Sequence, residues 1–127
     1  MKPLILIFAL GVAGALGTVS RYGVSQLTLW WFGSRYPWGT FCVNILGCLL
    51  FGIFAELFTS GRFSPEWKLV VLTGFLGGFT TFSAFAFEME QLRGLGFPHL
   101  ALLHFAGNNI LGIFAMIAGM MIGRSVT

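Results

Sequence analysis

The chain has 127 residues, of which 57% are hydrophobic and 9% are charged, and its mean hydropathy is +0.89. A soluble domain of this size could not cover its surface with so few charges, so the composition excludes that class and predicts an integral membrane protein. The net charge of +3 comes from basic residues that stand singly along the chain, which argues against nucleic acid as a partner.

Four apolar stretches follow one another and are separated by short connectors rich in Gly, Pro or charge. We expect membrane-spanning helices at about residues 3–31, 39–58, 67–92 and 98–123. Each is long enough to cross ~30 Å of hydrocarbon at ~1.5 Å per residue. The connectors leave no room for another domain, so the sequence predicts one all-α, four-helix transmembrane domain over residues 1–127.

The first stretch contains Arg21 after eighteen uncharged residues, Pro3 to Ser20. A lipid-facing arginine at that depth costs at least ~2.5 kcal/mol, so we expect Arg21 near one membrane face or in a wet cavity. An arginine that only extends its side chain to the interface is the alternative.

The basic residues divide almost evenly between the two predicted membrane faces. On the face with the termini we expect Lys2, Arg62, Lys68 and Arg124, and on the other face Arg21, Arg35 and Arg93. Helix orientation follows an excess of basic residues on one side, and four against three is a small excess. The sequence therefore permits insertion in both orientations and an antiparallel homodimer.

The third stretch contains "GFLGGFTTFSAFAFE" at residues 74–88. The glycines Gly74, Gly77 and Gly78 precede Thr80 and Thr81, so the backbone can leave helical geometry there at low steric cost. Freed carbonyls at membrane depth need a partner, and a broken helix with inward-facing carbonyls is a recurring cation site. The alternative is a glycine-rich packing surface on an unbroken helix.

Phenylalanines recur every three residues in this stretch, at Phe79, Phe82 and Phe85, and alternate with Thr81 and Ser83. Such spacing usually indicates ordinary core packing. The edge of an aromatic ring carries the positive part of its quadrupole, however, so rings presented edge-on can face an anion. The alternation with hydroxyls favours that second interpretation.

Asparagines lie inside two other predicted helices. Asn44 follows Thr40 by four residues in the second helix, and Asn109, next to Asn108, lies near the middle of the fourth. Such amides often only join helices, for about 1 kcal/mol each. Together with the hydroxyls of the third stretch, they outline a track lined by hydrogen-bond donors.

Acidic residues are absent from mid-membrane depth in the first, second and fourth helices, and Glu88 is the last residue of the stretch at residues 74–88 in the third. This pattern argues against a proton-coupled exchanger, which needs an intramembrane carboxylate. His104 has no acid or cysteine near it in the sequence, so we expect a structural histidine. The sequence shows no nucleophile with a base and no metal-ligand spacing, so an enzyme is not expected.

Three motifs carry a resemblance to a known family. Residues 11–22 follow "GxxGAxxRY" with looser spacing, residues 37–47 read "PWGTFCVNILG", and residues 73–85 read "TGFLGGFTTFSAF". With these motifs in this order, the chain resembles the Fluc (CrcB-type) family of microbial fluoride channels nearly end to end. It departs from the family pattern at Ala84 and Ile113, where a hydroxyl is usual.

The resemblance implies a passive channel that exports fluoride across the inner (plasma) membrane. It implies a multi-pass, dual-topology, antiparallel homodimer in contact with membrane lipid, with two pores and a structural sodium ion (Na+) on the two-fold axis. The residues that it assigns are Gly77 and Thr80 (sodium, through backbone carbonyls), Asn44, Phe82, Phe85, Thr81, Ser83 and Asn109 (fluoride pore), and Arg21 (entrance vestibule). Thr40 and Glu88 are further candidates.

Two other functions compete with a fluoride channel. A small dual-topology cation or multidrug exchanger shares four helices, but it should carry a carboxylate in its first helix, where this chain has none. A non-conducting membrane assembly protein predicts that Asn44 and Phe82 serve only in packing.

Overall fold

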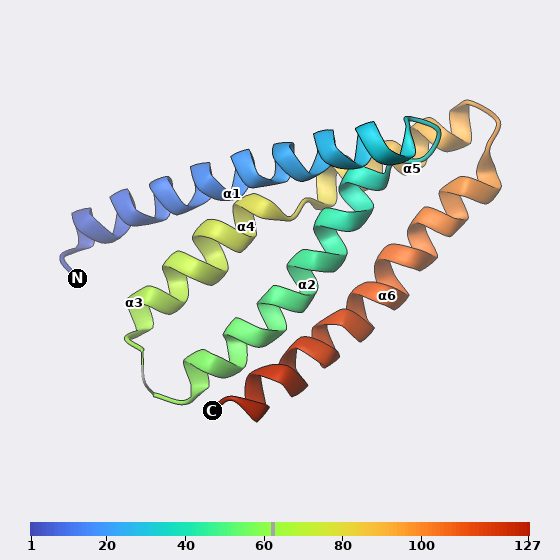
Figure 1. Ribbon diagram of the computed structural model, residues 1–127. Coiled ribbons are helices and arrows are strands. Elements are labelled where there is room, and N and C mark those ends of the chain that lie inside the picture. Colours follow the sequence, from blue (N-terminus) through green and yellow to red (C-terminus); the bar gives the residue numbers. More distant parts are fainter. Residues whose placement is uncertain (62) are drawn as a thin grey trace.

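The computed structural model describes residues 1–61 and 63–127, and Arg62, which was counted above among the basic residues, lies outside them. Its elements are α1 (Pro3–Phe32), α2 (Trp38–Thr59), α3 (Pro65–Lys68), the π-helix η1 (Leu69–Leu76), α4 (Gly77–Phe79), α5 (Phe82–Gly94) and α6 (Pro98–Ser125) (Figure 1). Within the described residues, four helical stretches are long and apolar enough to cross a membrane: 3–32, 38–59, 65–94 and 98–125. The prediction of an all-helical chain with four such stretches is confirmed.

Proline and glycine set the boundaries of these helices. Prolines begin α1, α3 and α6, where the missing N–H has no intrahelical partner to lose and the fixed φ suits a first turn. Gly33 and Gly96 follow helix ends with φ of +74° and +83°, a conformation that residues with a Cβ rarely adopt. The connections between the long helices can therefore be short.

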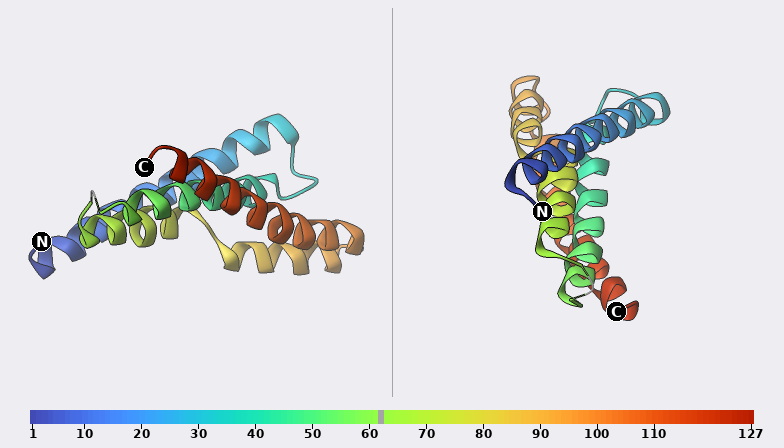
Figure 2. Two further views of the ribbon diagram at one scale, coloured as in Figure 1. Left: turned by 90° about the horizontal axis from the view of Figure 1, so that it is seen from below. Right: turned by 90° about the vertical axis from the view of Figure 1, so that its left-hand side faces the viewer.

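The third span is made of pieces with different geometry. After η1 and α4, the backbone of Thr80 and Thr81 is extended, with ψ of 160° and 124°, and α5 begins at Phe82. Figures 1 and 2 show α5 beside α6 rather than along the axis of α4. The parts before the extended residues pack on α1, whereas α5 packs on α6.

The helices pack closely where glycines meet backbone. A Cβ on Gly119 of α6 would lie 2.1 Å from the carbonyl oxygen of Leu49 on α2. A Cβ on Gly17 of α1 would lie 2.1 Å from the carbonyl oxygen of Phe75. Small residues allow this approach, which provides van der Waals contact in a medium without a hydrophobic drive between helices.

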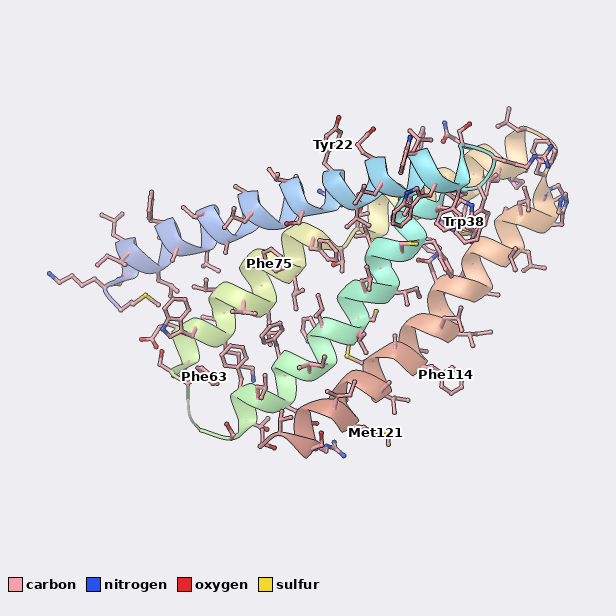
Figure 3. The ribbon with its side chains drawn as sticks, in the orientation of Figure 1. Tyr22, Trp38, Phe63, Phe75, Phe114 and Met121 are labelled. Atoms are coloured by element: carbon pink, nitrogen blue, oxygen red, sulfur yellow. The ribbon has the colours of Figure 1, made fainter. Side chains whose placement is uncertain are left out.

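The outer faces of the long helices are apolar. Phe114 on α6 and Tyr22 on α1 project away from the neighbouring helices and are 64% and 66% exposed (Figure 3). In the most apolar 18-residue segment of α1, only 11% is buried within the protomer, and the share is the same in α6. These faces suit a lipid environment, as expected for a multi-pass membrane protein.

Both chain termini lie at the end of the molecule that holds the connection between α2 and α3 (Figure 1). Ion pairs hold this end together: the amino group of Met1 lies 2.7 Å from Glu66 Oε1, and Arg124 Nη2 lies 2.9 Å from Glu56 Oε1. The other connections, 33–37 and 95–97, lie at the opposite end. Both termini lie at the same end, as expected for a chain that crosses the membrane an even number of times.

Candidate functional site

The extended backbone of the third span is paired with a side chain of α2. The Thr81 N–H donates to Asn44 Oδ1 at 3.0 Å, and Asn44 Nδ2 donates to the Thr81 carbonyl at 3.1 Å. One amide thus satisfies both backbone groups of Thr81, each of which would cost several kcal/mol unpaired in hydrocarbon. The Thr81 hydroxyl accepts from the Ala84 N–H at 3.2 Å and caps α5.

A cavity of about 280 Å³ adjoins this pairing. It brings together five of the six residues for which a place in the pore was predicted: Asn44, Thr81, Phe82, Phe85 and Asn109. The sixth, Ser83, is exposed and does not line the cavity, although its hydroxyl lies 3.5 Å from that of Thr81. The other lining residues are Gly47, Cys48, Phe51, Thr80, Asn108 and Met116.

Of the phenylalanines that line the cavity, Phe82 and Phe85 differ in their surroundings. Their ring centroids are 5.6 Å apart with planes at 50°. Phe85 is buried against His104, 5.2 Å away between centroids, whereas Phe82 is 79% exposed. The protomer therefore fixes Phe85 by packing and leaves most of the Phe82 ring uncovered.

A second cavity, of about 390 Å³, shares Thr81 with the first. It brings Arg21 together with Thr40 and Glu88, the three remaining side chains singled out from the sequence. The Thr40 hydroxyl donates to Glu88 Oε1 at 2.7 Å. A cationic group thus shares a cavity with a carboxylate at the depth of the extended backbone.

Sequence reasoning did not foresee the hydrogen bonds of Asn108, which lines the first cavity beside Asn109. Asn44 Nδ2 also donates to Asn108 Oδ1 at 3.1 Å, and Asn108 Nδ2 donates to the His104 carbonyl at 2.9 Å. Asn109, by contrast, is exposed and donates to the Phe105 carbonyl on its own helix at 2.7 Å. The signal available in the sequence was the spacing of His104 and Asn108, since residues four apart share a helix face.

The prediction that His104 has no acid partner is wrong. Its side chain is fully buried, and its Nε2 lies 3.3 Å from Glu88 Oε2. Its Nδ1 lies 3.1 Å from the hydroxyl of Tyr36, in the connection between α1 and α2. The histidine and the acid are sixteen positions apart in the chain and meet because α5 packs beside α6.

Burial is the main cause that raises the pKa of Tyr36 to about 12, and the nearby Glu88 and Cys42 add to the shift because their negative charge disfavours a phenolate. The hydroxyl of Tyr36 therefore keeps its proton at neutral pH. It can act as a hydrogen-bond donor to the imidazole beside it.

Backbone oxygens, rather than side chains, are the groups that could hold a metal ion. Among the described residues, no cluster of three or more His, Cys, Asp or Glu side chains could do so. Helix α4 ends at Phe79, and the last carbonyls of a helix lack intrahelical donors. The Leu76 carbonyl is met by the N–H of Thr80 at 3.0 Å and by its hydroxyl at 2.9 Å, and Gly77 lies exposed on the protomer surface.

Comparison with known proteins identifies the family. A family model described as "CrcB-like protein, Camphor Resistance (CrcB)" matches residues 8–120. Similar proteins named "Fluoride-specific ion channel FluC" include one from Maridesulfovibrio salexigens, 40% identical over 92% of this chain and 94% of the relative. Others come from Nitrosococcus oceani, 42% identical over 92% and 94%, and Rhizobium johnstonii, 44% identical over 89% and 91%.

These matches confirm the resemblance expected from the three sequence motifs. The relatives are named as ion channels, so the kinship also confirms the expectation that the protein is not an enzyme. Together with the four apolar spans, it indicates a multi-pass membrane protein, which in bacteria means the plasma membrane. The chain therefore belongs to the CrcB-like protein family.

Proposed function

We propose that the protein is a passive, fluoride-selective channel that exports fluoride across the plasma membrane. The observation that carries this proposal is the cavity at the extended backbone of the third span, whose lining includes uncharged amides, hydroxyls and the rings of Phe51, Phe82 and Phe85. The names of the relatives support fluoride as the ion.

The chemistry of the lining suits a small, strongly hydrated anion. A selective pore must replace the water around such an ion and still let it leave, which requires several weak binding groups rather than one strong one. Asn44, Thr81 and Asn109 offer neutral amide and hydroxyl groups, and the rings of Phe82 and Phe85 can offer their positive edges. Ser83, beside Thr81, would extend the polar track.

The second cavity would serve as the entrance. Arg21 would attract anions there by its charge, and a narrow cavity focuses such a field. Thr40 and Glu88, which are hydrogen-bonded to each other, would line the path toward Thr81, the residue common to both cavities.

A second copy of the chain would complete the pore. Phe82 is 79% exposed on the protomer, so its ring needs another surface to become part of an enclosed path. The nearly even distribution of basic residues permits the two copies to insert in opposite orientations. We therefore propose an antiparallel, dual-topology homodimer with two pores.

A structural sodium ion would fit between the two copies. Na+ prefers oxygen ligands, and the carbonyls of Gly77 and Thr80 lie where the helical pattern stops. Gly77 is exposed, and a Cβ there would meet only the Leu72 carbonyl, at 3.8 Å, so a second copy could approach it closely. An experimental structure with only water and no short carbonyl contacts on the two-fold axis would refute this site.

Fluoride efflux from liposomes tests the channel. Purified protein in vesicles loaded with potassium fluoride should release fluoride rapidly when valinomycin carries the balancing potassium, and should release chloride far more slowly. An exchanger would need a counter-substrate outside, and an assembly protein would release neither ion. Release no faster than from empty vesicles, or equal release of both anions, would refute the proposal.

A further inference from the structure

A continuous chain of hydrogen bonds connects the cavity to a buried histidine. It starts at the backbone of Thr81, passes through the side chains of Asn44 and Asn108, and reaches His104. The successive donor–acceptor distances are 3.0, 3.1 and 3.2 Å. Such chains polarise their members and fix one another's orientation.

The orientation of the two asparagine amides in this chain follows from the N–H group of Thr81. The Thr81 N–H can only donate, so Asn44 must present Oδ1 to it and Nδ2 to Asn108. Asn108 must then present Oδ1 to Asn44 and Nδ2 to His104, where it donates to the carbonyl at 2.9 Å and lies 3.2 Å from Nδ1. The Tyr36 hydroxyl, which can donate or accept, lies 3.1 Å from the same Nδ1.

This pattern determines the tautomer of His104. The Asn108 amide nitrogen can only donate, so Nδ1 accepts from it and the ring proton is on Nε2. The Tyr36 hydroxyl can then also donate to Nδ1. Nε2 lies 3.3 Å from Glu88 Oε2, and within the part of the chain that the structure describes both atoms are buried and neither makes a hydrogen bond. A neutral imidazole with its proton on Nε2 therefore suits each of its neighbours.

We infer that His104 is a positioning residue of the channel, whose neutral form orients Asn108 and, through it, the amide of Asn44, so that a second proton on His104 lowers fluoride conduction. This inference rests on the proposed fluoride channel. A proton on Nδ1 would face the N–H group of Asn108, and the Asn108 amide would have to turn. Its own N–H would then face that of Asn44, and the hydrogen bond between Asn44 and Asn108 would be lost.

The positive charge that a second proton gives His104 should also lower fluoride conduction. A full positive charge beside an anion path holds the ion too strongly for fast exit. Among the described residues, Glu88 on α5 and Tyr36 in the connection between α1 and α2 contact His104 directly. Arg21 on α1 and Arg35 in that connection each share a cavity with Glu88, and Cys42 on α2 acts on Tyr36 by its charge. Because the pKa of Tyr36 is raised to about 12, its hydroxyl keeps its proton near neutral pH.

The pH profile of fluoride efflux tests this inference. The wild-type rate should fall as the pH is lowered from about 8 to about 5.5 if a second proton on His104 disturbs the asparagine pair. Protein-free vesicles at each pH give the baseline, because hydrogen fluoride crosses bilayers unaided. His104→Gln, which cannot titrate, should give a flat profile.

The exposed His99, at the start of the same helix, supplies the matched control. His99→Gln should keep the wild-type profile. A wild-type rate that does not change with pH, or a fall that persists in His104→Gln, would overturn the inference while leaving the channel intact. Absence of fluoride release at every pH would instead refute the channel itself.

A spectroscopic measurement tests the tautomer without relying on flux. The chain has two histidines, so His99→Gln leaves His104 as the single imidazole. Nitrogen-15 NMR of this variant in lipid at about pH 8 should show a protonated Nε2 and an unprotonated Nδ1. A protonated Nδ1 would overturn the inference.

Discussion

The helices α2 and α6 are held together by different chemistry along their two halves. Toward the termini the contact is between backbones, since a Cβ on Gly52 would lie 2.3 Å from the Met116 carbonyl oxygen, and one on Gly119 lies as close to Leu49. Toward the opposite end, Asn44 and Asn108 join the helices by an amide hydrogen bond.

The difference separates a scaffold from a responsive region. A backbone contact depends on shape alone, and a change in pH or in the ion leaves it unchanged. An amide pair has alternative partners, because an anion or a turned neighbour can take the same donor. The glycine half should therefore set whether the protein folds, and the asparagine half should set how it conducts.

Gly119→Ala should have the largest effect. The added methyl group meets a backbone atom at 2.1 Å, which cannot move aside as a flexible side chain could, so the helices must separate. We expect a loss of about 3 kcal/mol, the upper end of overpacking costs. Thermal unfolding and gel filtration in detergent measure it, with Gly23→Ala, where nothing lies within 4 Å, as the control. Equal stability of the two variants would show that the close contact is absent.

Asn44→Ala should come next and should act on conduction. It leaves the Thr81 N–H and carbonyl without their partner, at a cost of about 1–3 kcal/mol for an unsatisfied group, so fluoride efflux should fall at least about fivefold. Gel filtration should still show the assembled protein. Cys48→Ala changes the same cavity without removing a hydrogen-bond donor to Thr81, and should conduct normally. Normal flux in Asn44→Ala would assign Asn44 to packing.

The neighbouring asparagines of α6 offer a finer test. Asn108→Ala removes a bond between helices and should lower stability by about 1 kcal/mol. Asn109→Ala removes only a bond to its own helix and should leave the unfolding temperature unchanged. Thermal unfolding of both variants checks the difference. A reversed order would mean that Asn109, rather than Asn108, faces α2.

Arg124→Gln should have the smallest effect. It removes an ion pair at the end with the termini, in which Arg124 is 64% and Glu56 14% exposed. Because the arginine is largely in contact with solvent, the pair should contribute little to stability. Fluoride efflux and gel filtration should match the wild type. A large loss of flux would show that the scaffold end also takes part in conduction.

The four spans could be predicted because hydropathy is a property of the sequence alone. Their bounds lie close to those expected; the second, for example, covers Trp38–Thr59 against an expected 39–58. The π-helix Leu69–Leu76 was not foreseen, since its eight residues are almost all apolar and carry no periodic signal. The extended backbone at Thr80 and Thr81 follows the glycines that lower the cost of leaving a helix.

The candidate site could be predicted only in part. Asn44, Thr81, Phe82 and Phe85 line one cavity because α2 and the third span cross at the extended residues. To decide whether Asn108 or Asn109 faces α2, one must know how α6 is rotated about its axis, because consecutive residues of a helix point about 100° apart. The partner of His104 depends on how α5 and α6 pack, which the sequence of neither helix reveals.

The extended residues Thr80 and Thr81 divide one membrane crossing into two packing partners. Insertion depends on the summed hydropathy of a segment, so residues 65–94 enter the bilayer as a single unit. Once inserted, the first part docks on α1 and the second on α6. Substitutions within either part should therefore be energetically coupled, whereas substitutions on opposite sides of Thr80 should be nearly additive. The crossing is one unit for biogenesis and two units for the energetics of the folded state.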